Sequence, residues 1–207
     1  MSRPPHRSLR RRRAGCDAPA VPRAKTPYQI CLATLRERGL FLAGDPTEEL
    51  QIRLLSHRDV ISTRLCARMR TLVHRSLWPD VLAMALSGGY WQTKWLPPTE
   101  ARLLALIDEE GSVRVDVALA ERVDAVLRNL GKTLEARLLV LGADVVTESG
   151  ASVRTLTSWW SWAAEKGVAP NPDADAARER LEAAARAVIL QPLLPWWDQP
   201  LRLRHPS

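Results

Sequence analysis

Cysteine and histidine are the residue types that most often bind zinc or form nucleophile–base pairs, and their spacing here argues against both uses. The sequence has three cysteines and four histidines, at Cys16, Cys31, Cys66, His6, His57, His74 and His205. None of them forms a CxxC pair or shows the ligand spacing of a zinc site. On a helix, Cys66 and His74 would be separated by about 12 Å along the axis, at ~1.5 Å per residue. We therefore expect structural thiols in a reducing cytoplasm, with no metal and no cofactor.

Short catalytic motifs give no better candidate for an active site. His57-Arg58-Asp59 matches the HRD tripeptide of protein kinases, but the Gly-rich loop, strand lysine and DFG that accompany it are missing. The sequence also has no P-loop, GxGxxG or HExxH motif. We assign no catalytic residue, and we expect His57 and His74 to be surface or capping groups.

Polar groups suited to nucleic-acid contact lie opposite an apolar stripe in the second half of the chain. The stripe has helical spacing and predicts one helix over about 121–136, with a core of Val123, Val126, Leu127, Leu130 and Leu134. The other side of this helix carries Arg122, Arg128, Asn129 and Lys132, together with Asp124 and Glu135. Arginine and asparagine can pair with base edges, and lysine can meet phosphates. We expect these four basic and amide groups to contact DNA; the alternative is a solvated face of mixed charge.

A predicted β-hairpin supplies a second set of candidate contacts. Two β-rich segments, LLVLGADVVTE and SVRTLTSW, flank Ser149-Gly150-Ala151. Glycine permits the tight turn, while hydroxyls and a guanidinium could bind the DNA backbone or enter a groove. The candidate residues at this tip, over about 148–154, are Ser149, Gly150, Ser152 and Arg154. Glu148 opposes that use, and a plain surface hairpin is the alternative.

The other expected elements are mostly helices. Start and stop signals predict helices over about 27–38, 46–55 and 56–77, then a short helix in WPDVLAMALSGG and a linker in GYWQTKWLPP. From residue 97 we expect a helix, a short extended SVRVD segment, a brief helix in VALAERV and the elements above. A short helix after the hairpin and an Ala-rich helix follow. The predicted parts are a basic tail over 1–25, a helical region over 26–96, a third part over 97–168 and a C-terminal helix with a Pro/Trp tail over 169–207.

The order helix, short helix, helix, hairpin over residues 97–158 resembles the winged helix-turn-helix of bacterial DNA-binding proteins. That resemblance implies a mainly α fold with a two-stranded β-hairpin wing, flanked by N-terminal helices and a C-terminal helix. It also implies that the helix near 121–136 enters the major groove and that the wing tip touches the backbone or minor groove.

The region EARLLVLGADVVTESGASVRTLTSWWSWA also resembles, faintly, the wing of the bacterial winged-helix DNA glycosylases that remove alkylated or crosslinked bases. Those enzymes use a Gln-X-Gln or Gln-X-Asp motif. The glutamines of this chain occur in QIC, QIR, QTK and two copies of QPL, none of which matches. The resemblance therefore implies a truncated or non-catalytic relative, and we do not expect an enzyme.

The basic character of the chain comes from its first residues. The formal net charge is +7, and residues 1–25 carry eight basic groups against Asp17 alone, so the other residues are balanced. We expect this tail to be disordered, either holding phosphates without specificity or reflecting a misplaced translation start. No apolar run approaches the ~18 residues of a membrane span, so we expect no membrane partner.

Tryptophans follow the hairpin directly, at Trp159, Trp160 and Trp162. Residues 159 and 162 share a helical face and residue 160 points elsewhere. Such rings bury large areas, so we expect them, and Trp196 and Trp197, to anchor helices rather than to stack on bases.

Duplex DNA is therefore the expected partner of this chain. Winged helices can also use the same face for proteins, and the balanced charge of residues 26–207 favours that alternative. A homodimer would suit two DNA half-sites.

Overall fold

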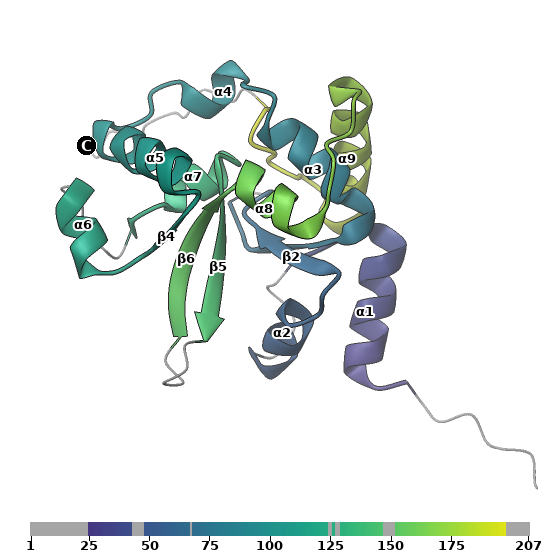
Figure 1. Cartoon of the computed structure of the whole chain (residues 1–207). Helices are drawn as coiled ribbons and strands as arrows, with labels where there is room; N and C mark the ends of the chain where they lie inside the picture. Colours follow the sequence, from purple (N-terminus) through teal and green to yellow (C-terminus); the bar gives the residue numbers. More distant parts are fainter. Residues whose placement is uncertain are drawn as a thin grey trace, which may run out of the picture.

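Two small antiparallel sheets, each accompanied by helices, lie next to each other in the middle of the molecule (Figure 1). The computed structural model describes residues 25–42, 48–66, 68–123, 126, 129–146 and 152–197. The fold in these ranges is mixed α/β rather than mainly α, because the first half contains a sheet that the sequence did not predict. No helix in these ranges is long and apolar enough to cross a membrane.

The first half is built around sheet order β1-β3-β2. Its elements are α1 (Pro27–Arg38), β1 (Leu40–Leu42), α2 (Glu48–Leu55), β2 (Val60–Thr63), β3 (Thr71–His74), the 3-10 turn η1 (Arg75–Leu77) and α3 (Trp78–Ala85). The short helix α4 (Tyr90–Thr93) lies in the expected linker.

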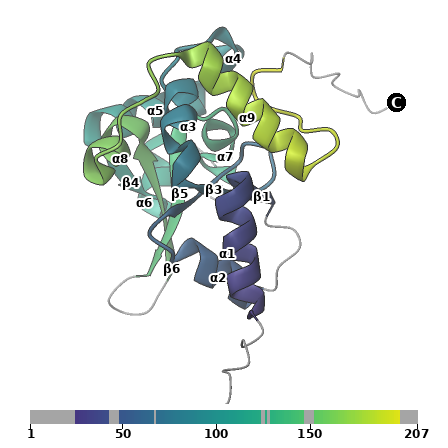
Figure 2. The ribbon, with the colours of Figure 1, turned by 90° about the vertical axis from the view of Figure 1, so that its right-hand side faces the viewer.

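The second half is built around sheet order β4-β6-β5. Its elements are α5 (Pro98–Glu110), β4 (Ser112–Arg114), α6 (Val117–Val123), α7 (Lys132–Ala136), β5 (Val140–Val146), β6 (Ser152–Ser158) and α8 (Trp159–Lys166). The predicted hairpin is present, and β4 adds a third strand to it by pairing with β6. Helix α9 (Ala174–Val188) then packs beside α3 (Figure 2).

The two halves repeat the same local geometry. The helices α1 and α5 both end at a left-handed glycine, Gly39 and Gly111, whose N–H donates to a carbonyl one turn back at 2.8 Å. The carbonyl of each glycine then accepts the N–H of the last residue of a central strand, His74 or Ser158, again at 2.8 Å. Each half therefore consists of a helix, an edge strand, a further helical stretch and a hairpin whose second strand lies in the middle.

The helix expected over 56–77 is wrong, because β2 and β3 occupy this segment. Ser56 does not begin a helix: its hydroxyl donates to the Ile52 carbonyl at 2.9 Å, at the end of α2. Val60, Ile61, Leu72 and Val73 are buried, so apolar residues occur in succession rather than alternating. Strands buried on both faces lose the period of two that distinguishes them from helices.

The single helix expected over 121–136 is also wrong. Helix α6 ends at Val123 and α7 begins at Lys132, with Gly131 between them in the left-handed region at φ +77°. Leu130 and Leu134 are buried as predicted, but Val126 is 73% exposed rather than in the core. A Cβ on Gly131 would lie 2.4 Å from Leu156 Cδ1, so the chain approaches β6 closely at the point where this left-handed residue interrupts the helix.

Tryptophans join the two halves. The rings of Trp78 on α3 and Trp162 on α8 meet edge to face, with centroids 5.2 Å apart, and Trp159 packs on Trp162 at 5.5 Å. Trp159 and Trp162 are buried and Trp160 is 67% exposed, which confirms the predicted division of these three rings. The same apolar cluster includes Trp196 from the C-terminal segment.

The C-terminal segment is fastened to α9 through Glu182. The indole N–H groups of Trp196 and Trp197 both donate to its Oε1, at 3.0 and 2.9 Å, and Arg178 Nε donates to the same atom at 3.0 Å. Burial of this carboxyl opposes ionisation, but these hydrogen bonds outweigh it and lower its pKa to about 2.

Gly131→Ala should destabilise the chain by about 3 kcal/mol. The alanine would be strained in the left-handed region, and its Cβ would clash with Leu156. Gly88→Ala is the matched control, since Gly88 is also left-handed at φ +63° but has open space around it. Its cost should be about 1 kcal/mol. Urea unfolding followed by circular dichroism measures both values, and equal losses would contradict the close approach.

Glu182 should make stability depend on acidity in a defined window. Its folded pKa lies below the ordinary value of 4.5, so the stabilisation is complete above about pH 4.5 and is lost as the pH falls towards about 2. Glu182→Gln should be less stable at neutral pH and should lose less stability over this window. Melting temperatures at several pH values test this, and parallel profiles for the two proteins would refute it.

Candidate functional site

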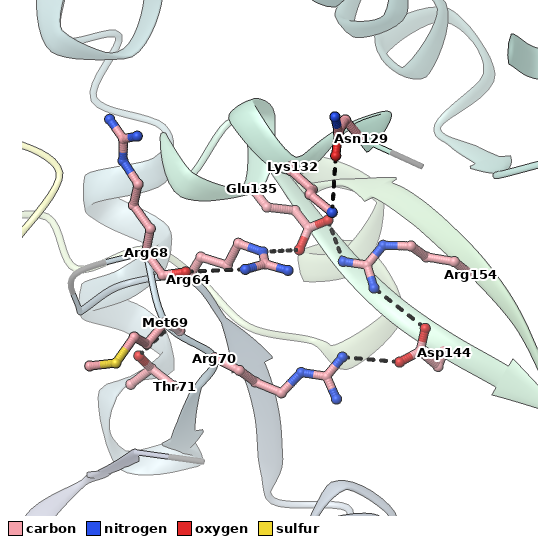
Figure 3. A network of polar contacts seen from close by, with 10 residues as sticks. All are labelled: Arg64, Arg68, Met69, Arg70, Thr71, Asn129, Lys132, Glu135, Asp144 and Arg154. Carbon is pink, nitrogen blue, oxygen red and sulfur yellow. Dashed lines mark hydrogen bonds and ion pairs between the residues drawn. The ribbon is translucent and has the colours of Figure 1, made fainter. Parts of the chain in front are cut away.

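The structure places five of the eight predicted contact residues. Arg128, Ser149 and Gly150 lie outside the described residues. Arg122 lies on α6 with a 54% exposed side chain, and it forms an ion pair with Glu110 of α5 at 2.8 Å. Ser152 is exposed at the start of β6. The remaining three, Asn129, Lys132 and Arg154, lie together in one polar network (Figure 3).

Glu135 is the centre of this network, although it was expected on a solvent-exposed face. Its side chain is only 6% exposed and binds Arg64 through Nε at 3.3 Å and Arg154 through a guanidinium NH2 group. Arg64 follows β2 in the first half, whereas Arg154 lies on β6 in the second. The carboxylate therefore links the two halves.

Gly142 makes room for this carboxylate. A Cβ at position 142 would lie 2.6 Å from Glu135 Cδ, so a side chain there would have to displace the carboxylate that α7 places against β5. A glycine within a strand often marks such a close approach. This was the one signal in the sequence that pointed to a side chain crossing the strand here.

A second carboxylate repeats the arrangement at the edge of the sheet. Asp144 on β5 binds Arg70 at 3.2 Å and Arg154 at 3.4 Å, with 43% of its side chain exposed. Arg70 comes from the turn between β2 and β3, so this pair also connects the halves (Figure 3). The outer strands β2 and β5 lie side by side at this junction.

Three arginines of the β2–β3 turn were missed by sequence reasoning. Arg64, Arg68 and Arg70 fell in the segment expected to be a helix and were not considered as contact residues. In the structure the exposed Arg68 has a left-handed backbone at φ +59°, and its carbonyl accepts a hydrogen bond from Arg64 at 3.1 Å. The turn therefore directs Arg64 to Glu135 of α7 and Arg70 to Asp144 of β5, while the Arg68 side chain points away from both carboxylates (Figure 3).

Lys132 and Asn129 stand on the second-half side of the same junction. Lys132 Nζ donates to Asn129 Oδ1 at 3.2 Å, and Lys132 is exposed. Beneath them, Glu100 of α5 is largely buried, which raises its pKa although the Gly131 amide donates a hydrogen bond to it. That hydrogen bond helps to fix the point at which α7 begins.

We call Arg64, Arg68, Arg70, Lys132 and Arg154 the basic face. Figure 3 shows these five cations with the carboxylates of Glu135 and Asp144, which bind Arg64, Arg70 and Arg154. Because residues 26–207 carry equal numbers of basic and acidic groups, the gathering separates charge within a balanced body. Such a face can attract anions, and arginine and lysine suit phosphate groups in particular.

The cysteine and histidines of the first half have structural surroundings. Burial raises the pKa of the Cys66 thiol to about 11, which keeps it protonated at neutral pH. The His74 ring accepts the Ser76 amide at 3.3 Å as the N-cap of η1, and His57 Nδ1 accepts the Asp59 amide at 3.2 Å in the turn before β2. Within the described ranges, no three His, Cys, Asp or Glu residues form a group that could hold a metal ion.

Comparison of the chain with protein-family models, curated proteins and solved structures found no match.

Glu135 and Arg64 should show energetic coupling. Glu135→Gln leaves two arginines without their buried partner and should cost about 2 kcal/mol, less than a fully buried pair because both arginines are partly exposed. In a double-mutant cycle with Arg64→Met, the two changes should couple by at least about 1 kcal/mol. Additive losses in urea unfolding would mean that the ion pair does not link the halves.

Proposed function

We propose that this chain binds duplex DNA through the basic face. One observation carries the proposal: the basic groups of the β2–β3 turn, α7 and β6 converge although the body of the protein has no net charge. Counterion release from DNA then favours binding, with phosphate contacts supplying most of the affinity.

The order of elements in the second half supports this proposal. The succession α5, α6, α7, β5, β6 resembles the winged helix-turn-helix, with α7 in the place of the third helix and β5–β6 in the place of the wing. Lys132 and Asn129 then stand where such proteins present contacts to DNA. Arg122 and Ser152 remain outer contacts in the same proposal, with Arg128, Ser149 and Gly150.

The geometry separates exposed cations from internally bound ones. Arg68 and Lys132 are exposed and are the residues we expect to meet phosphates. Arg64 and Arg154 have side chains only 26% and 24% exposed, and both are bound by Glu135. We expect these two to shape the surface and to contribute its field rather than to contact a phosphate directly.

A protein-binding module is the second candidate function. Val117 on α6 and Val126 after it are 62% and 73% exposed, so the second half also presents apolar side chains beside its polar ones. Apolar contacts would depend little on salt, whereas DNA binding weakens steeply as salt rises. The proposed function is DNA binding without base excision, and we assign no catalytic residue.

Replacing both exposed cations of the basic face should weaken DNA binding. Arg68→Ala with Lys132→Ala should lower the slope of log K against log salt by about 2, or about 1 for each phosphate contact. Fluorescence anisotropy with a blunt duplex of mixed sequence, measured over a salt series, gives the slope. Arg38→Ala, on α1 away from the basic face, is the control and should leave the slope unchanged.

The same series should be run on a chain that begins at Lys25, which keeps every described residue. This form tests whether the folded part binds without the basic tail. If all binding disappears with residues 1–24, or if the double variant keeps the full slope, the basic face does not bind DNA. Binding of a protein partner at a salt-independent affinity would then favour the second function.

A further inference from the structure

The segment Tyr90–Trp95, between the two halves, presents two aromatic rings to solvent. Tyr90 is 71% exposed and Trp95 is 82% exposed, the greatest exposure of any described tryptophan. By contrast, Trp91 and Gln92 face inward: the Trp91 ring packs on Trp196 with centroids 6.0 Å apart, and Gln92 is buried. We call residues 90–95 the aromatic segment.

The backbone of the aromatic segment is held at several points. Gln92 Oε1 accepts the Gly89 amide at 2.9 Å, and Gln92 Nε2 donates to the Ala85 carbonyl at 2.8 Å. Arg137 follows α7, and one of its guanidinium nitrogens donates hydrogen bonds to the carbonyls of Gln92 and Lys94. The exposed rings therefore stand on a fixed backbone, so that less conformational freedom is lost when they bind a ligand.

Trp95 adopts a backbone conformation that is unfavourable for any residue with a Cβ. Its φ is +56°, in the left-handed region that costs a residue with a Cβ about 1–2 kcal/mol. Most of its ring is in water, so burial of this side chain does not offset the cost. Strain of this kind persists where the surroundings impose it, and it often accompanies a binding site.

Two cations lie at the aromatic segment, and one of them, Arg137, connects it to α7. Lys94 Nζ lies 5.2 Å from the centroid of the Tyr90 ring. Burial lowers the pKa of Arg137, and the charge of Arg68 adds to this shift. The same Arg137 holds the carbonyl next to Trp95. The aromatic segment therefore adjoins the end of α7, the helix that carries Lys132 of the basic face.

We propose that Tyr90 and Trp95 stack on unpaired bases of a nucleic acid held by the basic face. This inference rests on the proposed function and extends it from duplex DNA to DNA with a single-stranded part. Flat exposed rings beside cations match the flat bases and charged backbone of an unpaired strand. Each base has a π face, so this recognition does not require a particular sequence.

The test compares two DNA probes on the full chain. One is a blunt duplex, and the other is the same duplex with a single-stranded extension of about six nucleotides, within the ~4–16 nucleotides typical of one binding site. Extensions at the 3′ and the 5′ end are tried separately. Fluorescence anisotropy gives Kd for the wild type and for Trp95→Ala, Trp95→Phe, Tyr90→Ala and Trp160→Ala.

The wild type should bind an extended probe more tightly than the blunt duplex, and Trp95→Ala should remove most of that preference. We expect Trp95→Ala to weaken binding of the extended probe about 10-fold, equivalent to about 1.4 kcal/mol, while blunt-duplex binding stays unchanged. Tyr90→Ala should have a similar but smaller effect. Trp95→Phe should keep most of the preference, because the ring remains.

Trp160→Ala is the matched control, since Trp160 is also exposed but lies on α8. An unchanged preference in Trp95→Ala, or an equal loss on both probes, would overturn the stacking proposal but not the proposal that the wild type binds duplex DNA. Failure of the wild type to bind either probe would instead overturn the proposed function together with this inference. If Trp95→Ala changes sedimentation from dimer to monomer, the rings belong to a protein interface and the proposal is wrong.

Discussion

The contact between Trp78 and Trp162 joins two small three-stranded sheets. A small sheet gains stability when its apolar face packs against helices. Here the helical layer is shared, because α3 and α8 each follow the central strand of one sheet and meet through these rings. The C-terminal segment adds Trp196 to the same cluster. Six of the eight Trp residues belong to this cluster or pack against it, whereas Trp95 and Trp160 are exposed.

Polar contacts determine the relative orientation of the two halves at this apolar junction. The apolar cluster favours contact between the halves, but dispersion and burial depend weakly on orientation. Glu135 and Asp144 each bind an arginine from the β2–β3 turn and also share Arg154. These geometrically specific pairs define how β2 lies along β5. The basic face is thus a product of the junction between the halves, and neither half has it alone.

The hairpin and the roles of its tryptophans could be predicted from sequence because their signals are local. Two β-rich segments around a glycine give β5 and β6, and helical spacing separates the buried Trp159 and Trp162 from the exposed Trp160. The sheet of the first half could not be predicted in this way. Its strands β2 and β3 are buried on both faces, and Ser56 with Asp59 imitates a helix start. The repeat of the two halves rests on equivalent backbone hydrogen bonds at Gly39 and Gly111, which leave almost no common sequence pattern.

The candidate site was predicted in part, and the difference lies in where charges find partners. Sequence reasoning placed Lys132, Asn129 and Arg154 among the contacts, and the structure brings these three together. It could not show that Glu135, four residues from Gly131, turns inward over Gly142 and forms an ion pair with Arg154. Nor could it show that Arg137 is bound to main-chain carbonyls of another segment. A basic residue in the sequence is only a source of charge, and its three-dimensional partners decide whether that charge holds the fold together or faces a ligand.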